Sequence, residues 1–196
     1  MNWLAHLFLS EPSASFRIGN LLPDVLRPGE LAALPSKFHP GIERHRLIDA
    51  FTDSHEIVKR SIARVGPTHR RFGGILVDIF YDHFLSTDWE QYSNVPLRTF
   101  TADTYASFEK FPTELPAEAF SRLQQIANDN WLCSYGSMEE LRVVLDRLGR
   151  RLRKPTSLAG SVRILEANYR EFRDDFAQFF PELVAHVAIE DTRRSN

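Results

Sequence analysis

The most apolar stretch of the chain runs from Ile75 to Leu85, where only Asp78, Asp82 and His83 interrupt aliphatic and aromatic residues. Apolar side chains then cover nearly every side of a helix with this sequence, which predicts that the helix is buried. A carboxylate is almost never fully buried without a partner, because an unpaired charge in an apolar interior is very costly. The pattern therefore predicts that something compensates these acids, and a bound metal ion is one candidate.

Helical spacing of apolar residues recurs along the rest of the chain, and no stretch shows the sustained two-residue alternation of a half-buried strand. Proline, glycine and polar turns separate the expected helices, which cover residues 2–10, 13–22, 42–65, 69–85, 96–111, 116–131, 137–152, 157–180 and 181–189. This pattern predicts an all-α fold, with a single compact multi-helix domain over residues 1–190. Residues 191–196 are expected to form a frayed C-terminal tail.

Composition narrows the range of partners. The chain has 196 residues, of which 43% are hydrophobic and 26% charged, as in an ordinary globular protein. A net charge of −2, with basic residues interspersed among acids, gives no argument for nucleic acid or an anionic membrane. The single cysteine, Cys133, excludes an internal disulfide framework and a cysteine-based zinc cage. The apolar N-terminal segment is too short to span a bilayer and has no cationic leader, so a cytoplasmic protein is expected.

Acids and histidines recur at helical spacing in two consecutive predicted helices. His45 and Asp49 are four residues apart, and so are Asp78 and Asp82, with His83 next in the chain. A step of four residues turns a helix by about 40°, so each pair lies on one stripe. Consecutive helices joined by a short turn are usually antiparallel neighbours. The two stripes are therefore expected to face each other.

Two interpretations of these stripes stay open. Carboxylates and imidazoles without thiolates favour Mn²⁺, Mg²⁺ or Fe²⁺ over structural zinc, which predicts a divalent metal site. In the alternative, nearby arginines pair with the aspartates in buried salt bridges and no metal binds. The arginines available for this are Arg44, Arg46, Arg60, Arg64, Arg70 and Arg71. His6, on a short apolar helix, either makes a core hydrogen bond or is an outer metal ligand.

Several blocks of the sequence resemble the acyl carrier protein phosphodiesterase family, whose members are also called acyl carrier protein hydrolases. The blocks are MNWLAHL at residues 1–7, GNLLPD at 19–24, GIERHRLIDAFTDSH at 41–55, DIFYDHFL at 78–85 and NWLCSY at 130–135. They occur in the family's order and extend over most of the chain. The resemblance implies an all-helical, HD-like fold, because the family is regarded as a divergent relative of the HD-type metal phosphohydrolases. It also implies a Mn²⁺-dependent hydrolysis that removes the 4′-phosphopantetheine arm from a serine of holo-acyl carrier protein.

The matched positions suggest roles for individual residues. The residues that fall on the family's motif positions are Asp24, His45, Asp49, Asp78, Asp82 and His83. We expect the metal to be held by Asp24, His45, Asp82 and His83, where it would polarise a phosphoryl oxygen and lower the pKa of its bound water. Asp49 and Asp78 are the expected catalytic carboxylates, which complete the metal shell, orient an imidazole or accept the proton of water.

Basic residues are expected to bind the substrate and the carrier protein. Arg46 could hold the phosphodiester by bidentate hydrogen bonds, and His6, Arg70 and Arg71 are the other expected substrate-binding residues. Acyl carrier proteins are small and acidic, so a basic docking surface is needed. The predicted docking residues are Arg142, Arg147, Arg150, Arg151 and Arg153. The alternative for this cluster is a solvated helix end whose cations complement the helix dipole.

Two competing functions share these features. An HD-type phosphohydrolase could use the same metal site to hydrolyse a nucleotide or another small phosphodiester without a carrier protein. A non-catalytic helical binding protein could instead keep all its acids and histidines in salt bridges. The two differ in metal content, because only the hydrolase needs a bound cation.

Overall fold

The protein is described by a computed structural model that covers residues 1–151, 156 and 158–195. Its α-helices are α1 (Trp3–Phe8), α2 (Ala14–Leu21), α3 (Pro28–Ala32), α4 (His39–Ser54), α5 (Glu56–Arg64), α6 (Gly73–Thr87), α7 (Leu97–Phe108), α8 (Ala117–Asn128), α9 (Met138–Arg151), α10 (Val162–Ala167) and α11 (Tyr169–Ser195). Short 3₁₀ helices are η1 (Leu22–Asp24), η2 (Ser36–Phe38), η3 (Pro67–Phe72), η4 (Trp89–Gln91), η5 (Trp131–Cys133) and η6 (Ala159–Ser161). The described residues contain no strand, which confirms the all-α fold.

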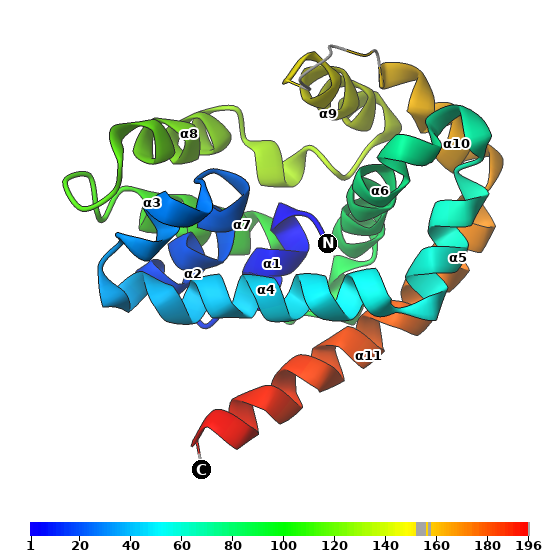
Figure 1. Ribbon diagram of the computed structural model, residues 1–196. Helices are drawn as coiled ribbons and strands as arrows, with labels where there is room; N and C mark the ends of the chain where they lie inside the picture. Colours follow the sequence, from blue (N-terminus) through cyan, green and yellow to red (C-terminus); the bar gives the residue numbers. More distant parts are fainter. Residues whose placement is uncertain (152–155, 157, 196) are drawn as a thin grey trace.

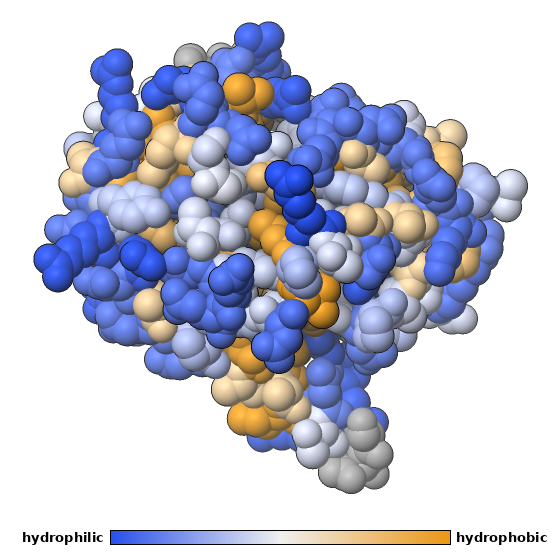
Figure 2. All heavy atoms as spheres, turned by 180° about the vertical axis from the view of Figure 1, so that it is seen from behind, coloured by the Kyte–Doolittle hydropathy of each residue, from blue (hydrophilic) through white to orange (hydrophobic). Residues whose placement is uncertain are grey.

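Helix α6 lies at the centre of the molecule, as its apolar sequence predicts. It packs against α1 on one side and against α5 and α11 on the other (Figure 1). Its buried residues include Phe80, Tyr81 and Phe84, which contact aromatic side chains of α11. The face of the molecule seen from behind is largely hydrophilic, with apolar side chains exposed only in small areas (Figure 2). Among the described helices, none combines the length and the apolar character needed to cross a membrane.

Helices α2 and α4 touch through their backbones at two glycines. A Cβ atom added to Gly19 would lie 2.2 Å from the Phe38 carbonyl oxygen, and one added to Gly41 would lie 2.2 Å from the Phe16 carbonyl oxygen. Neither position has room for a side chain larger than hydrogen. This close approach brings the end of α2 against the first turns of α4, next to the candidate site.

The prediction of a single helix over residues 42–65 is wrong, because the structure has two helices there. Helix α4 ends at Ser54, and His55 has extended backbone angles of φ −75° and ψ 131° before α5 begins at Glu56. The Nδ1 atom of His55 accepts a hydrogen bond from the Ile57 amide at 3.3 Å, so this histidine caps α5. The chain changes direction here, and α5 runs at a large angle to α4 (Figure 1). Similarly, residues 67–72 form η3, and α6 begins only at Gly73.

The helix boundary expected at Pro181 is also wrong, because α11 continues through it. A proline inside a helix loses one backbone hydrogen bond, but the neighbouring Phe179, Phe180 and Leu183 are fully buried, and their packing favours the continuous helix. The helix extends to Ser195, through residues expected to fray. Its last turns are tied to α4 by ion pairs between Asp191 and Arg44 and between Arg194 and Glu43.

Candidate metal centre and the pocket beside it

His6, His45 and Asp49 form a cluster at the boundary between the interior and solvent. The His6 Nε2 atom lies 3.2 Å from Asp49 Oδ1, and the His45 Nε2 atom lies 3.0 Å from Asp49 Oδ2. The three residues offer donor atoms that all lie within 4.8 Å of one another. Both histidines are buried, whereas the Asp49 side chain is 42% exposed. A small ion could therefore reach these donors from solvent.

Asn20 orients both imidazole rings. Its Oδ1 atom lies 3.0 Å from His6 Nδ1, and its carbonyl oxygen lies 2.7 Å from His45 Nδ1. The Asn20 amide nitrogen donates to the His6 carbonyl at 2.6 Å and to Ser10 Oγ at 2.8 Å, which identifies Oδ1 as the acceptor. Each imidazole therefore directs its Nε2 atom at Asp49, and the His6 Nε2 atom also lies 3.2 Å from the Met1 carbonyl oxygen. Metal-binding histidines are usually held in this way.

The electrostatics of the cluster favour a cation. Burial alone would raise the pKa of Asp49, but hydrogen bonds from His45 and His6 outweigh it and lower this pKa, so the carboxylate is ionised. Burial lowers the pKa of His6, which keeps that ring neutral. For His45, the neighbouring carboxylates of Asp49 and Asp24 outweigh burial and raise the pKa. An ionised carboxylate facing two imidazole nitrogens is a donor set that suits a divalent cation.

Two more carboxylates flank the cluster. Asp24 Oδ1 lies 3.7 Å from His45 Nε2, and Asp24 Oδ2 accepts a hydrogen bond from the Trp3 indole at 2.7 Å. Asp78 Oδ1 lies 3.1 Å from the Met1 α-amino nitrogen, which is also 3.9 Å from Asp49. Burial raises the pKa of Asp78, so this carboxylate holds a proton more readily than an exposed one. Both acids are partly exposed.

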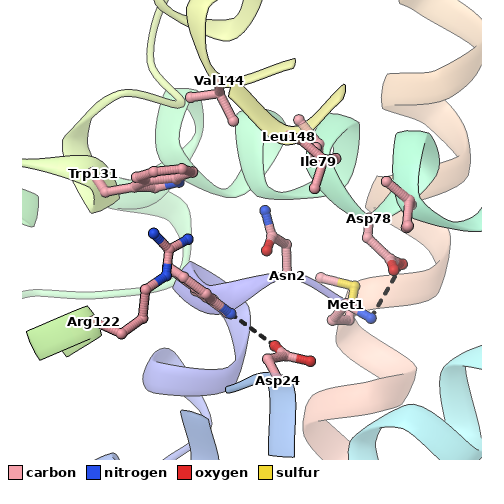
Figure 3. Close-up of a pocket in the computed structure, with 11 residues that line it drawn as sticks. Met1, Asn2, Asp24, Asp78, Ile79, Arg122, Trp131, Val144 and Leu148 are labelled. Carbon is pink, nitrogen blue, oxygen red and sulfur yellow. Dashed lines mark hydrogen bonds and ion pairs between the residues drawn. The ribbon is translucent and has the colours of Figure 1, made fainter. Parts of the chain in front are cut away.

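A pocket of about 360 Å³ opens beside these acids (Figure 3). Its walls come from the N-terminal segment, η1, α6, α8, η5 and α9, and its lining residues are Met1, Asn2, Trp3, Asp24, Ile75, Asp78, Ile79, Arg122, Trp131, Val144 and Leu148. Asp24 and Asp78 join the pocket to the histidine cluster. Arg122 is the one cationic side chain among these lining residues. Mixed apolar and charged walls of this size suit a small organic anion.

Comparison with known proteins identifies the family. The model of the family described as acyl carrier protein phosphodiesterase matches residues 1–183. The chain belongs to the acyl carrier protein phosphodiesterase family. Proteins named acyl carrier protein phosphodiesterase from Yersinia pestis and Pectobacterium atrosepticum are each 31% identical to it, over 94% of this chain and 96% of theirs. The one from Photorhabdus laumondii is 30% identical over 97% of both chains. No solved structure matches the chain.

Two of the expected metal ligands, Asp82 and His83, lie elsewhere. Asp82 is fully buried and accepts hydrogen bonds from the amides of Leu4 at 2.8 Å and Ala5 at 3.1 Å. It therefore satisfies the first turn of α1, and burial raises its pKa to about 8. His83 contacts the Tyr135 carbonyl through Nδ1 at 2.7 Å and the Tyr169 hydroxyl through Nε2 at 3.1 Å. Because protein groups occupy all these polar atoms, we do not assign either residue to the metal.

The arginines expected at the substrate are exposed residues outside the pocket. Arg46 is exposed and lines a separate pocket of about 170 Å³ with residues of α3 and α4. Arg70 and Arg71 are exposed on η3, where Arg71 stacks over the Phe72 ring. None of the three lines the pocket beside the cluster.

The alternative in which arginines pair with the aspartates of the site is not seen among the described residues. Arg44 pairs with Asp191, while Arg60 and Arg64 both pair with Asp175. Across the described part of the chain, no arginine or lysine forms an ion pair with the carboxylates of the site. These carboxylates are Asp24, Asp49, Asp78 and Asp82. Histidine side chains and the α-amino group are the neighbours instead.

The basic docking residues lie partly within ion pairs. Arg142 pairs with Glu139 at 3.7 Å, Arg147 with Asp129 at 3.0 Å and Arg150 with Asp146 at 2.7 Å. All three arginines remain substantially exposed. The side chain of Arg151 and the whole of Arg153 lie outside the described residues.

Sequence reasoning missed two residues of the site. Asn20 lies in the GNLLPD block that carries the family resemblance, so the sequence contained a signal for it. Arg122 had no such signal, because the residues that surround it come from α1, η5 and α9, which are far apart in the chain.

Proposed function

We propose that this protein hydrolyses the phosphodiester that joins 4′-phosphopantetheine to the serine of holo-acyl carrier protein, which yields the apo-carrier. The observation that carries the proposal is the convergence of His6, His45 and Asp49 beside a pocket in a chain of this family. Attack of water on phosphorus breaks the bond to the serine oxygen, so the products are a free serine hydroxyl and 4′-phosphopantetheine. We further propose that the reaction takes place in the cytoplasm.

The residues of the cluster fit a divalent cation. Imidazole and carboxylate donors without a thiolate favour Mn²⁺, Mg²⁺ or Fe²⁺. We assign the metal to His6, His45 and Asp49, with Asp24 as the neighbouring carboxylate that is 3.7 Å from His45 Nε2. When bound, such a cation supplies Lewis acidity at the phosphoryl group. Mn²⁺ is the ion that we propose, on the strength of the family resemblance.

The proton of the attacking water needs an acceptor. Asp78 lines the pocket, and burial raises its pKa, which makes it a stronger base than an exposed carboxylate. We propose that Asp78 is this general base. Asp24 is held in place by the Trp3 indole and faces the same pocket, where it helps to orient the reacting groups.

Helix α9 offers a place for the carrier protein. Val144 and Leu148 of this helix line the pocket, while Arg142, Arg147 and Arg150 lie on its exposed sides. An acidic carrier bound along these arginines would stand next to the pocket entrance, and its prosthetic arm could enter from there. We therefore propose that the carrier docks on α9.

The proposal is tested by incubating the protein with holo-acyl carrier protein and Mn²⁺ and measuring the intact mass of the carrier. The expected result is loss of the mass of the prosthetic arm, abolished by a chelator and by His45→Ala. Hydrolysis of bis(p-nitrophenyl) phosphate or a cyclic nucleotide without any change in the carrier would favour a small-molecule phosphohydrolase. If neither substrate reacts and Mn²⁺ does not bind, the non-catalytic binding protein is the better description.

A further inference from the structure

Arg122 is stacked against two tryptophans at the wall of the pocket. Its guanidinium carbon lies 5.3 Å from the ring centroid of Trp3 and 5.3 Å from that of Trp131. The two indoles are neighbours, with ring centroids 5.6 Å apart and an angle of 44° between their planes. Cation–π contacts with two rings restrict the guanidinium plane, so Arg122 is preorganised although its Cα is on the partly exposed helix α8.

Trp3 connects this guanidinium to the metal cluster. Its indole nitrogen donates to Asp24 Oδ2 at 2.7 Å, while its ring contacts Arg122. The other oxygen of Asp24 lies 3.7 Å from the His45 Nε2 atom. Trp3 therefore contacts both the guanidinium of Arg122 and the carboxylate of Asp24. These two side chains lie at the edge of the same pocket (Figure 3). The arrangement defines where an anion between them would lie.

The hydrogen-bonding capacity of Arg122 is largely unused by the protein. A guanidinium has five N–H donors, and the hydrogen bond seen for Arg122 runs from Nη1 to Gln125 Oε1 at 2.9 Å on the exposed side. Throughout the described residues, no carboxylate forms an ion pair with it. Other half-buried arginines, such as Arg64, do pair with an acid. A stacked guanidinium facing a pocket without an acid partner is suited to an anionic ligand.

We propose that Arg122 binds the non-bridging oxygens of the substrate phosphodiester, and that the apolar wall formed by Ile79, Val144 and Leu148 receives the pantetheine arm. This assignment rests on the proposed function, because it takes 4′-phosphopantetheine as the group that enters the pocket. The guanidinium would then hold the phosphoryl group in the pocket beside Asp24 and Asp78. The predicted substrate arginines Arg46, Arg70 and Arg71 are outside the pocket and are replaced in this role by Arg122.

The test measures binding of free 4′-phosphopantetheine by calorimetry, alongside steady-state kinetics with holo-carrier. Arg122→Ala should weaken 4′-phosphopantetheine binding by roughly 10- to 100-fold, the effect of losing charge-assisted hydrogen bonds. Arg122→Lys keeps the charge but loses the planar guanidinium that stacks on the tryptophans. Its affinity for 4′-phosphopantetheine should lie between those of the wild type and Arg122→Ala. The affinity for Mn²⁺, measured in the absence of substrate, should stay unchanged in both variants, since Arg122 is not a ligand.

Arg17→Ala is the matched control. Arg17 is also a half-buried arginine, and its guanidinium carbon lies 5.5 Å from the Phe100 ring centroid on the α2–α7 side, away from the pocket. Its variant should bind 4′-phosphopantetheine as the wild type does. The Arg122 variants and Arg17→Ala should have the same helical content and melting temperatures within a few degrees of each other. A loss of binding in the Arg122 variants is then not caused by unfolding.

The outcomes separate this inference from the proposed function. Binding of 4′-phosphopantetheine that depends on Arg122, without hydrolysis of holo-carrier, supports the site and overturns the function. Hydrolysis with normal kcat/KM in Arg122→Ala, or equal 4′-phosphopantetheine affinity in wild type and Arg122→Ala, overturns the assignment of Arg122. A variant that loses affinity for the carrier but binds the free arm normally also overturns it, because Arg122 would then contact the carrier surface.

Discussion

The imidazole rings of His6 and His45 stack face to face, with centroids 4.2 Å apart and planes 18° from parallel. They come from different helices, and their Nε2 atoms approach opposite oxygens of the same Asp49 carboxylate. Two stacked imidazolium ions would repel each other, which agrees with the lowered pKa of buried His6. A single divalent cation could instead bind both neutral rings and the carboxylate.

The first prediction concerns metal binding. Saturating Mn²⁺ should raise the melting temperature of the wild type by roughly 5–10 °C, the scale expected for a ligand well above its Kd in a domain of this size. His6→Ala and His45→Ala should lose this rise, because each removes an Nε2 donor. Differential scanning fluorimetry with and without Mn²⁺ measures it. His83→Asn is the control and should keep the rise in melting temperature. Loss of the rise in His83→Asn, with the rise kept in His6→Ala and His45→Ala, would identify His83 as a metal ligand instead.

The second prediction separates a structural acid from a ligand. Asp82→Ala removes the acceptor for the amides of Leu4 and Ala5, and it should lower the free energy of unfolding by about 1–2 kcal/mol, as for the loss of a helix cap. Asp82→Asn keeps one acceptor oxygen and should cost less. Urea titration followed by circular dichroism gives these values. Both variants should retain the Mn²⁺-induced rise, and a variant with normal stability that binds no Mn²⁺ would contradict the capping role.

The third prediction concerns Asn20. Asn20→Ala removes the acceptor that orients His6 but leaves the backbone carbonyl that orients His45, so metal affinity should fall by roughly 10- to 100-fold without being lost. Titration with Mn²⁺ followed by calorimetry measures the change. Ser10→Ala removes the hydrogen bonds of Ser10 Oγ with the Asn20 amide and the His6 carbonyl but no contact of an imidazole ring, so its affinity should be much closer to that of the wild type. Equal losses in the two variants would argue for a general packing defect.

The fourth prediction concerns stability and pH at a site far from the metal. Buried Asp175 accepts hydrogen bonds from Ser61 at 2.7 Å, from Arg60 Nε at 2.9 Å and from Arg64. Burial alone would raise the pKa of Asp175, but these hydrogen bonds outweigh it and lower the pKa. The stabilisation is therefore complete above the unfolded pKa of about 3.9 and is lost as the pH falls through the lower folded value.

Asp175→Asn should accordingly lower the free energy of unfolding at pH 7 by about 1–2 kcal/mol, because it leaves two partly exposed guanidinium groups without their acid. The difference from the wild type should shrink as the pH falls below about 4. Urea titrations at several pH values measure both effects. Asp174→Asn, at the exposed neighbouring position, should change neither. A difference that is constant with pH would show that the charge of Asp175 is not what stabilises the fold.

The fifth prediction concerns carrier docking. Reversing charge in Arg142→Glu and Arg150→Glu should raise KM for holo-carrier, by roughly tenfold at low salt, while kcat changes little. The effect should disappear at high ionic strength because the arginines are exposed. Arg98→Glu reverses an exposed charge on α7 and serves as the control. An unchanged KM at low salt would remove α9 as the docking surface.

The sequence predicted the helical class and the burial of α6, because both follow from local apolar periodicity. The same periodicity could not show that His55 leaves the helix, since a single side chain capping Ile57 decides that break. It also could not show that α11 continues through Pro181, where packing of distant aromatic residues compensates for one lost hydrogen bond. The local apolar pattern therefore predicts that helices form, whereas tertiary contacts determine the residues at which they begin and end.

The candidate site divides in the same way. The pair of His45 and Asp49 was predictable because the two residues are one helical turn apart. The burial of Asp82 was also predictable, but its partners are amides 77 and 78 residues earlier in the chain, so the sequence suggested a metal where the fold supplies a helix end. His6 and Arg122 reach the site only through the packing of α1 and α8, and no spacing rule connects them to it.

The backbone contact between Gly19 and Gly41 makes the reactive geometry depend on two positions that carry no functional group. A methyl group at either position would push α2 away from α4, and the hydrogen bond from His45 to the Asn20 carbonyl would lengthen with it. Loss of activity in this protein can therefore arise from changes that touch neither ligand nor substrate. Substitutions that keep every charged residue would still inactivate the enzyme if they increased the distance between α2 and α4 at this contact.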